Sequence, residues 1–283
     1  MRAYLELTKP NITWLILMST GVGYFFGARD EWNWWSVLHT LLGTGLLASG
    51  TSALNQWWER EADARMRRTQ DRPIPSGRLA PGQALLFGVL LAVGGFAELV
   101  VNVNPLSGLL GAFTLLSYLF LYTPLKQRSP HATTIGAVPG AMPPLIGFAA
   151  AAGTLTIEAW ILFAILFLWQ FPHFHAISWM YRDDYGRAGI RVLPVVEPDG
   201  RSTARQILLT SLVLIPVSLA PSWFAMSGPW YAAGALVMGL LFLAAGVRVA
   251  REKTLSRARG VLLTSVVYLP VLYALMVVDR TAR

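Results

Sequence analysis

Nine apolar runs occupy most of the sequence, and each is close to the length needed to cross a bilayer. They lie near residues 11–28, 36–56, 83–102, 106–124, 132–152, 157–180, 206–225, 229–249 and 260–278. A transmembrane helix needs about 20 apolar residues, and helices satisfy their own backbone groups where lipid offers no hydrogen-bond partner. Strands of a membrane barrel would be about half as long and would alternate in polarity. We therefore predict an all-α integral membrane protein, with about nine transmembrane helices in one bundle and a single domain over residues 1–283.

The overall composition agrees with this fold class. Of the 283 residues, 54% are hydrophobic and 13% are charged. Because the chain has no cysteine, disulfides, thiolate metal sites and covalent CxxCH haem attachment are excluded. The first apolar run follows Arg2 and Lys9 and lacks a convincing small-residue cleavage site, so we expect a retained helix rather than a leader.

The positive charges are concentrated on one side of the predicted bundle. Of the 23 lysines and arginines, all but Arg29, Arg280 and Arg283 lie in the N-terminal tail or in the second, fourth, sixth and eighth connections. The positive-inside rule places these segments in the cytoplasm and the C-terminus outside. We therefore predict a multi-pass protein of the cell (inner) membrane with a cytoplasmic N-terminus. The net charge of +8 then reflects topology in the lipid bilayer, and no nucleic-acid partner is expected.

Two of the cytoplasmic connections are long, at about residues 57–83 and 181–205. The connections on the opposite side are short and nearly uncharged. Any active site is therefore expected on the cytoplasmic side, within these two loops.

The first long loop opens with oxygen-bearing side chains at helical spacing. Asn55, Glu59 and Asp63 follow one another every four residues, so a continuing helix would place them on one face with a drift of only about 40°. Arg68 and Arg72 repeat this spacing just beyond them. Carboxylates with substrate phosphate and water suit Mg²⁺, and arginine suits the phosphate. The alternative is an amphipathic helix end whose acids and arginines pair with each other and with lipid headgroups.

The second long loop carries another acidic pair. Asp183 and Asp184 are adjacent, and Arg182, Arg187 and Arg191 surround them. Metal sites on both loops would hold a diphosphate from its two ends. The alternative for each aspartate is a helix cap or a solvated turn.

Several ordered motifs resemble one family. The spacing of Asn55, Glu59 and Asp63 is similar to the NxxxExxxD form of the Asp-rich signature of the UbiA-type intramembrane prenyltransferases. More narrowly, the chain resembles the haem O synthase family between about residues 50 and 195. The motifs that carry this resemblance are NQWWE, RTQDRP, PSGR, YTPLK, GAVPGAMPPLIG, PHFHAISW and DDYxxAGIxxLPV.

The resemblance implies a central cavity open to the cytoplasmic side and a prenyl diphosphate bound through Mg²⁺. The implied reaction joins farnesyl diphosphate to a vinyl group of haem B, with water adding, to give haem O for terminal oxidases. A haem-handling protein or haem A synthase is a candidate partner. The implied metal-binding residues are Asn55, Glu59, Asp63, Asp183 and Asp184, of which all but Asp183 are also assigned as catalytic. The implied diphosphate-binding residues are Arg68, Arg72, Lys126 and Arg182, and His173 is the implied haem contact.

Two alternatives to this function stay open. The first is a UbiA-type enzyme with a different aromatic or tetrapyrrole acceptor. Relatives that use other acceptors usually carry aspartate at the position of Glu59 and carboxylates at those of Tyr181 and Tyr185, so these tyrosines indicate a second cluster with fewer metal ligands. The second alternative is a transporter of an amphipathic anion. Acid clusters on one face argue against it, since alternating access needs groups that can be reached from both sides.

Two histidines close the last turns of an apolar helix. His173 and His175 are two residues apart, so their side chains point in different directions and at most one readily faces a common site. A neutral imidazole at His173 suits an axial ligand to haem iron. A structural hydrogen bond to a neighbouring helix is the alternative.

Overall fold

The computed structural model describes residues 1–28 and 32–281 of the chain. These residues form helices joined by turns, with one isolated antiparallel bridge between Ser227 and Arg280. The predicted all-α class is confirmed. The predictions made for Arg29 and Arg283 fall outside the described residues.

The helices follow the predicted apolar runs. In chain order they are α1 (Arg2–Leu7), α2 (Pro10–Gly27), α3 (Trp34–Trp58), α4 (Arg60–Ala64), α5 (Pro81–Asn102), α6 (Pro105–Leu116), the π-helical turn η1 (Ser117–Tyr122), α7 (Thr123–Leu125), α8 (Ala132–Gly140), α9 (Pro143–Ala152), α10 (Ile157–Met180), α11 (Arg182–Arg187), α12 (Leu193–Val196), α13 (Arg201–Trp223), α14 (Pro229–Arg251) and α15 (Leu255–Val278). Several of them begin with proline, which suits the first helical position because its missing N–H would have no intrahelical partner there.

Eight helical segments of the described chain are long and apolar enough to cross a membrane. They are Trp34–Trp58, Pro81–Asn102, Pro105–Leu125, Ala132–Ala152, Ile157–Met180, Arg201–Trp223, Pro229–Arg251 and Leu255–Val278. The run predicted near 11–28 is the 18-residue helix α2, but polar residues such as Asn11 make it less apolar than these eight. The structure thus supports eight candidate spans by length and composition, and the ninth span stays a prediction.

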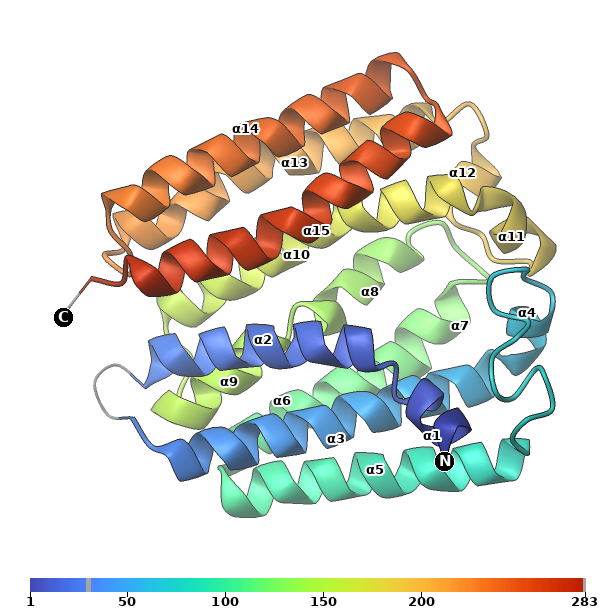
Figure 1. The fold of residues 1–283 in the computed structure, drawn as a ribbon, viewed down its shortest axis with the longest axis horizontal. Coiled ribbons are helices and arrows are strands. Elements are labelled where there is room, and N and C mark those ends of the chain that lie inside the picture. The colour runs from blue at the N-terminus through green and yellow to red at the C-terminus, as the bar shows by residue number, and fades with distance from the viewer. Residues whose placement is uncertain (29–31, 282–283) are drawn as a thin grey trace.

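The helices pack side by side, and the short elements gather at one end of the bundle. Figure 1 shows α1, α4, α11 and α12 at the end that also holds the N-terminus, whereas α15 ends at the opposite end. The two long loops predicted to be cytoplasmic therefore meet at the same end of the molecule. At the opposite end of the described bundle, the connections between helices are shorter than these two loops.

The contact between α2 and α9 depends on glycine. A β-carbon added at Gly147 would collide with the carbonyl oxygen of Thr20, and one added at Gly23 would collide with that of Pro144. Backbones that touch in this way are typical of membrane helix interfaces, where small residues permit close van der Waals packing. This contact holds the C-terminal half of α2 against α9.

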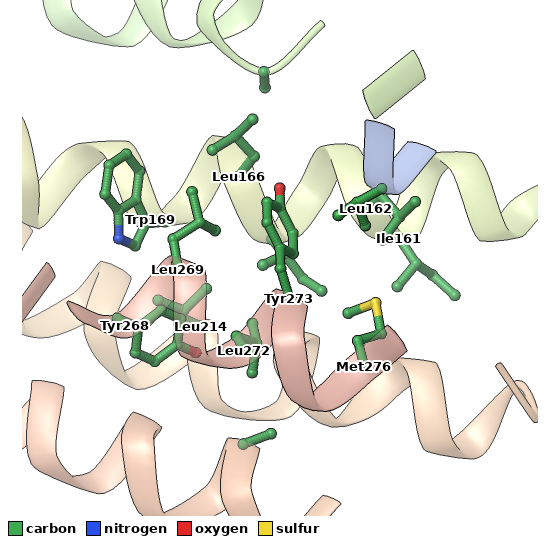
Figure 2. Close-up of a cluster of buried hydrophobic side chains, with 14 of the residues drawn as sticks. Ile161, Leu162, Leu166, Trp169, Leu214, Tyr268, Leu269, Leu272, Tyr273 and Met276 are labelled. Carbon is green, nitrogen blue, oxygen red and sulfur yellow. The ribbon is translucent and has the colours of Figure 1, made fainter. Parts of the chain in front are cut away.

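The largest apolar core is built mainly by α10, α13, α14 and α15, with some residues of α2 and α9. Figure 2 shows Trp169 of α10 beside Leu269 of α15, with Tyr273 of α15 directed toward α10 and Leu214 of α13 close by. Large apolar side chains are also exposed along the outer faces of the spans, as expected for surfaces that contact lipid. The four-helix core holds α10 and α15 in a fixed relation, which bears on the histidines described below.

Candidate active site

The two long loops contact each other directly. The backbone N–H of Arg68 donates to Asp184 Oδ2 at 3.3 Å. Ala62 and Met66 of the first loop pack in one buried cluster with Ala188 and Ile190 of the second. The loops predicted to act together are therefore joined in the fold.

The three oxygen-bearing side chains of the first loop keep their helical spacing. Helix α3 ends at Trp58 and α4 begins at Arg60, yet Glu59 N–H donates to Asn55 O at 2.9 Å and Asp63 N–H donates to Glu59 O at 2.8 Å. The four-residue repeat thus continues through the junction. Asn55 is only 2% exposed and Asp63 only 3% exposed, which is unusual for a solvated helix end. These backbone hydrogen bonds place Asn55, Glu59 and Asp63 on one helical face, as predicted.

Glu59 forms a buried ion pair with Lys126. Lys126 Nζ lies 2.7 Å from Glu59 Oε1, and the side chains are 14% and 13% exposed. Burial alone would raise the pKa of Glu59, but the charge and hydrogen bond of Lys126, together with Lys9 and Asn55, outweigh it and hold that pKa below its usual range. Burial would likewise lower the pKa of Lys126, but Glu59, together with Tyr122 and Tyr118, outweighs it and raises that pKa well above its usual range. Both groups are therefore charged at neutral pH.

Lys126 also lies against aromatic rings that a π-helical turn presents. Its Nζ is 4.5 Å from the centre of the Tyr122 ring and 5.8 Å from that of Tyr118. Both tyrosines belong to η1. Short π-helical turns inside α-helices are frequent at functional sites. The Thr123 hydroxyl beside them accepts a hydrogen bond from Asn55 Nδ2 at 3.2 Å, which ties this turn to the first cluster.

Asp63 forms a second ion pair, with Arg72. Arg72 Nη1 donates to both carboxylate oxygens of Asp63, at 2.8 and 2.7 Å. The Thr69 hydroxyl donates to the backbone carbonyl of Asp63 at 2.9 Å, which holds the loop between them in place. The two buried carboxylates are thus each balanced by one cation, and the cations come from different parts of the chain.

The second loop contributes one of its two aspartates. Asp184 is 8% exposed and accepts hydrogen bonds from Arg68 N and from Arg187. The Asp183 side chain is 87% exposed, and its partner is Arg182 at 3.8 Å. The structure therefore brings Asp184 to the first loop, whereas Asp183 faces outward.

The arginines assigned to diphosphate binding differ in their surroundings. Arg68 stacks over the rings of Tyr181 and Tyr185, at 5.0 and 5.8 Å from their centres. Arg182 stacks over Trp179 at 5.1 Å. Arg68 consequently stands at the junction of the two loops, and Arg182 lies on the outer side of the second.

Lys9 is a member of this region that the sequence analysis did not single out. It precedes α2 with a left-handed backbone (φ 47°), a conformation that is uncommon for residues other than glycine. Desolvation, together with the charges of Arg72 and Lys126, lowers the pKa of Lys9 to about 7. The only sequence signal was a basic residue directly before Pro10 and the first apolar run.

A cavity of about 430 Å³ opens beside these cations. Its lining includes Lys9, Asn11, Gln56, Arg68 and Arg72. Its volume is in the range of ligand-binding clefts. Its lining carries three cationic side chains and two acidic ones, Glu6 and Asp71, so cations are in a small excess. The larger central cavity implied by the family resemblance stays a prediction.

The two histidines of α10 have different partners. His175 is 2% exposed, and its Nε2 lies 2.6 Å from Gln206 Oε1 of α13. His173 Nδ1 lies 2.7 Å from Ser265 Oγ of α15. The side chains therefore point in different directions, as expected. The Nε2 atom of His175 forms a hydrogen bond within the fold.

Comparison with known proteins decides the family. The sequence matches the UbiA prenyltransferase family over residues 16–268, which is most of the chain. The chain belongs to the UbiA prenyltransferase family. Membership makes it a membrane prenyltransferase and confirms the family resemblance inferred from the motifs.

Two relatives within the UbiA prenyltransferase family match almost the whole chain. The protoheme IX farnesyltransferase of Solibacter usitatus (strain Ellin6076) is 64% identical over 289 residues, covering 99% of both chains. That of Koribacter versatilis (strain Ellin345) is 46% identical, covering 99% of this chain and 94% of the relative.

Solved structures show the same UbiA fold at low sequence identity. A structure of digeranylgeranylglyceryl phosphate synthase has a TM-score of 0.81 at 19% identity and covers 98% of this chain and 97% of that one. A UbiA homologue from Archaeoglobus fulgidus bound to GPP and Mg²⁺ has a TM-score of 0.67 at 14% identity and covers 97% and 99%. At these identities the likeness establishes the fold.

The first cluster of this UbiA prenyltransferase has the chemistry that a divalent cation requires. In the part of the chain that is described, no three His, Cys, Asp or Glu side chains gather into a metal-binding group. Mg²⁺, however, is commonly held by one or two carboxylates together with substrate phosphate and water. Asn55, Glu59 and Asp63 offer one amide and two carboxylates from one helical face, and each carboxylate is paired with a cation, Glu59 with Lys126 and Asp63 with Arg72. These residues therefore fit Mg²⁺.

Proposed function

We propose that this UbiA prenyltransferase transfers a farnesyl group from farnesyl diphosphate to a vinyl group of haem B, with addition of water, to form haem O for terminal oxidases. The observation that carries the proposal is the 64% identity, over 99% of both chains, to a protoheme IX farnesyltransferase. The cations Lys9, Arg68 and Arg72 that line the cavity beside the first loop support it, because an allylic diphosphate must lose a highly charged leaving group.

The first step is the departure of diphosphate from the farnesyl chain. The bond between C1 and the diphosphate oxygen breaks, and both electrons leave with the oxygen. Lys126, Arg68 and Arg72 would stabilise the charge that develops on the leaving group, and a site shielded from water strengthens that effect. Arg182 belongs to the same proposal, although its side chain is more exposed than those of Lys126 and Arg72. Mg²⁺ bound by Asn55, Glu59, Asp63 and Asp184 would supply further neutralisation of the diphosphate.

The second step forms the new carbon–carbon bond. The vinyl π electrons of haem B attack C1, and positive charge is left on the vinyl carbon next to the porphyrin ring. Water then bonds to that carbon and releases a proton. No residue needs to deprotonate the acceptor before the attack, because the vinyl π electrons themselves form the new bond. The rings of Tyr118 and Tyr122 beside Lys126 would shelter developing positive charge.

The proposal also covers the haem contact, the metal ligands, the membrane location and the partner protein. His173 would contact the haem. Asp183 would join the metal site only after turning inward from its exposed position. The basic connections support a cytoplasmic N-terminus in the inner membrane. A haem-handling protein or haem A synthase would receive the product, because haem O is too apolar to be released into water.

The product assay tests this function directly. Purified protein in detergent is given haem B, Mg²⁺ and labelled farnesyl diphosphate, with and without EDTA, and products are separated and weighed by mass spectrometry. We expect a haem product that carries the farnesyl group plus water and that is lost with EDTA. Label on a different acceptor, with haem B unchanged, would leave the prenyltransferase assignment intact and overturn the acceptor. Label released only as farnesol would likewise count against haem B.

A further inference from the structure

His173 faces the interior of the bundle. Its neighbour Trp169, four residues earlier on α10, donates from Nε1 to the backbone carbonyl of Ser265 on α15 at 2.8 Å. Gln170 donates from Nε2 to the carbonyl of Ala137 on α8 at 3.0 Å. At about 100° per residue, His173 falls between these two directions, about 40° from Trp169 and about 60° from Gln170. Its side chain therefore projects between α8 and α15.

The lipid-facing side of α10 lies elsewhere. Phe174 is 37% exposed and Trp160 is 46% exposed. The same helical rotation places both of them outside the arc between Trp169 and Gln170. His173 consequently does not share the membrane-facing surface of its helix.

The hydrogen bonds of Ser265 determine which nitrogen of His173 carries the proton. Ser265 is fully buried, and its hydroxyl donates to the carbonyl of Leu262 at 2.6 Å. A serine hydroxyl has one proton, so Oγ can only accept in its 2.7 Å contact with His173 Nδ1. Nδ1 therefore carries the proton and donates it. A neutral ring then has its lone pair on Nε2.

The ring is also held in orientation. The Trp169 indole stacks on the His173 imidazole, with centres 4.6 Å apart and planes 21° apart. Because Trp169 is itself bonded to the Ser265 backbone, one residue of α15 fixes both the ring and its stacking partner. Among the described residues the hydrogen bond of the His173 ring is at Nδ1 and none is found at Nε2, so the Nε2 lone pair is available to a ligand.

We infer that Ser265 is a positioning residue for haem: it fixes the Nδ1–H form of His173 and so presents the Nε2 lone pair to the iron of the acceptor. This inference rests on the proposed function and deepens it. Histidines that bind metals typically donate their other N–H to an outer partner, which sets the tautomer and raises ligand basicity. The side-chain Oγ of Ser265 has that role here.

Haem B titration of the full-length protein in detergent tests the inference. Ser265→Ala should weaken haem B binding by about 10-fold or more, the usual effect of losing an outer partner, and should alter the absorption and EPR signals of the bound ferric haem. Ser265→Thr keeps an accepting hydroxyl and should restore both. Thr264→Ala is the matched control, because the Thr264 hydroxyl bonds only within its own helix, to Gly260. Unchanged farnesyl diphosphate binding in Ser265→Ala would show that the variant is folded.

The His173→Ala background separates positioning from an independent effect. There, Ser265→Ala should cause no further loss of haem affinity, because Ser265 acts through the imidazole. If His173→Ala weakens haem binding but Ser265→Ala behaves like Thr264→Ala, the inference fails while the proposed function stands. If His173→Ala leaves the haem titration unchanged, His173 is not the haem contact and Ser265 is not its positioning residue. A wild-type protein that binds haem B but forms no farnesylated haem would overturn the proposed function alone.

Discussion

Lys126 Nζ lies 2.7 Å from Glu59 Oε1, and this ion pair joins two segments that are 67 residues apart in the chain. Both side chains are largely buried. The pair therefore links the first oxygen cluster to the end of the fourth predicted span. Its charges also serve the proposed chemistry, because one member suits a metal ion and the other suits diphosphate.

Lys126→Met should remove activity and also destabilise the protein. The substitution leaves the Glu59 carboxylate buried without its partner, and breaking a buried pair typically costs about 3–5 kcal/mol. Thermal melting in detergent and the product assay would measure the two effects. Adding Glu59→Gln should recover much of the stability but none of the activity, because the unpaired charge is gone while the metal ligand and diphosphate contact are still missing.

The pair of Arg78 and Glu6 provides the control for this prediction. Their contact is equally short, at 2.7 Å, but the side chains are 42% and 35% exposed. Exposed pairs contribute about 0–1 kcal/mol, so Arg78→Met should change the melting temperature little. Equal losses in Lys126→Met and Arg78→Met would contradict the importance assigned to burial.

The adjacent aspartates of the second loop should differ in their effect on catalysis. Asp184→Asn should lower kcat/KM for farnesyl diphosphate by about 100-fold, because Asp184 contacts the Arg68 backbone and lies at the junction of the loops. Asp183→Asn should lower it by less than about 3-fold, since its carboxylate faces solvent. These ratios correspond to roughly 2.7 and 0.7 kcal/mol in the transition-state free energy. A larger effect at Asp183 would show that this side chain turns inward when substrate binds.

Gly147→Ala should disrupt the contact between α2 and α9. The added methyl group would overlap the Thr20 carbonyl, and overpacking of this kind costs about 1–3 kcal/mol. Gly94→Ala in α5 is the matched control, because nothing lies within 4 Å of the new β-carbon and alanine is a better helix former than glycine. Melting curves of the two variants should therefore shift in opposite directions, and a shared shift would argue against direct backbone contact at Gly147.

Helix positions could be predicted because long apolar runs have few alternatives in lipid. The spacing of Asn55, Glu59 and Asp63 likewise indicated one face, since the helical repeat depends only on local backbone geometry. The break between α3 and α4 was not predicted, but the hydrogen bonds across it preserve the spacing. The first apolar run forms a helix, as expected. Its polar residues make it less apolar than the eight candidate spans.

The side-chain partners could not be predicted in the same way. Adjacent residues such as Asp183 and Asp184 differ by about 100° in direction on a helix, and only the packing of the second loop decides which one faces inward. The pairing of His173 with Ser265 spans 92 residues and depends on the contact between α10 and α15. Lys9 lies at the site because α2 begins beside the first loop. No local sequence pattern predicts this arrangement.

Lys9 should give the enzyme a pH dependence near neutrality. Its pKa is lowered to about 7 from the usual 10.5, so in the free enzyme its side chain is charged below about pH 7 and neutral above it. If Lys9 helps to bind diphosphate, kcat/KM for farnesyl diphosphate, which reports ionisations of the free enzyme, should fall as pH rises through 7. Lys9→Arg should remove this decline because guanidinium stays charged, whereas Lys126 cannot cause it because Glu59 keeps it protonated.

The stability of the protein should change in the opposite direction over part of the same range. Between about pH 7 and 10.5 the unfolded chain binds a proton at Lys9 that the folded chain has lost, so the contribution of Lys9 makes folding more favourable as pH rises. Lys9→Met should abolish this trend along with the decline in kcat/KM. Activity that falls above pH 7 in Lys9→Met as steeply as in the wild type would assign the ionisation to another group. A wild-type decline without the accompanying gain in melting temperature would place the titrating group on the substrate rather than on Lys9.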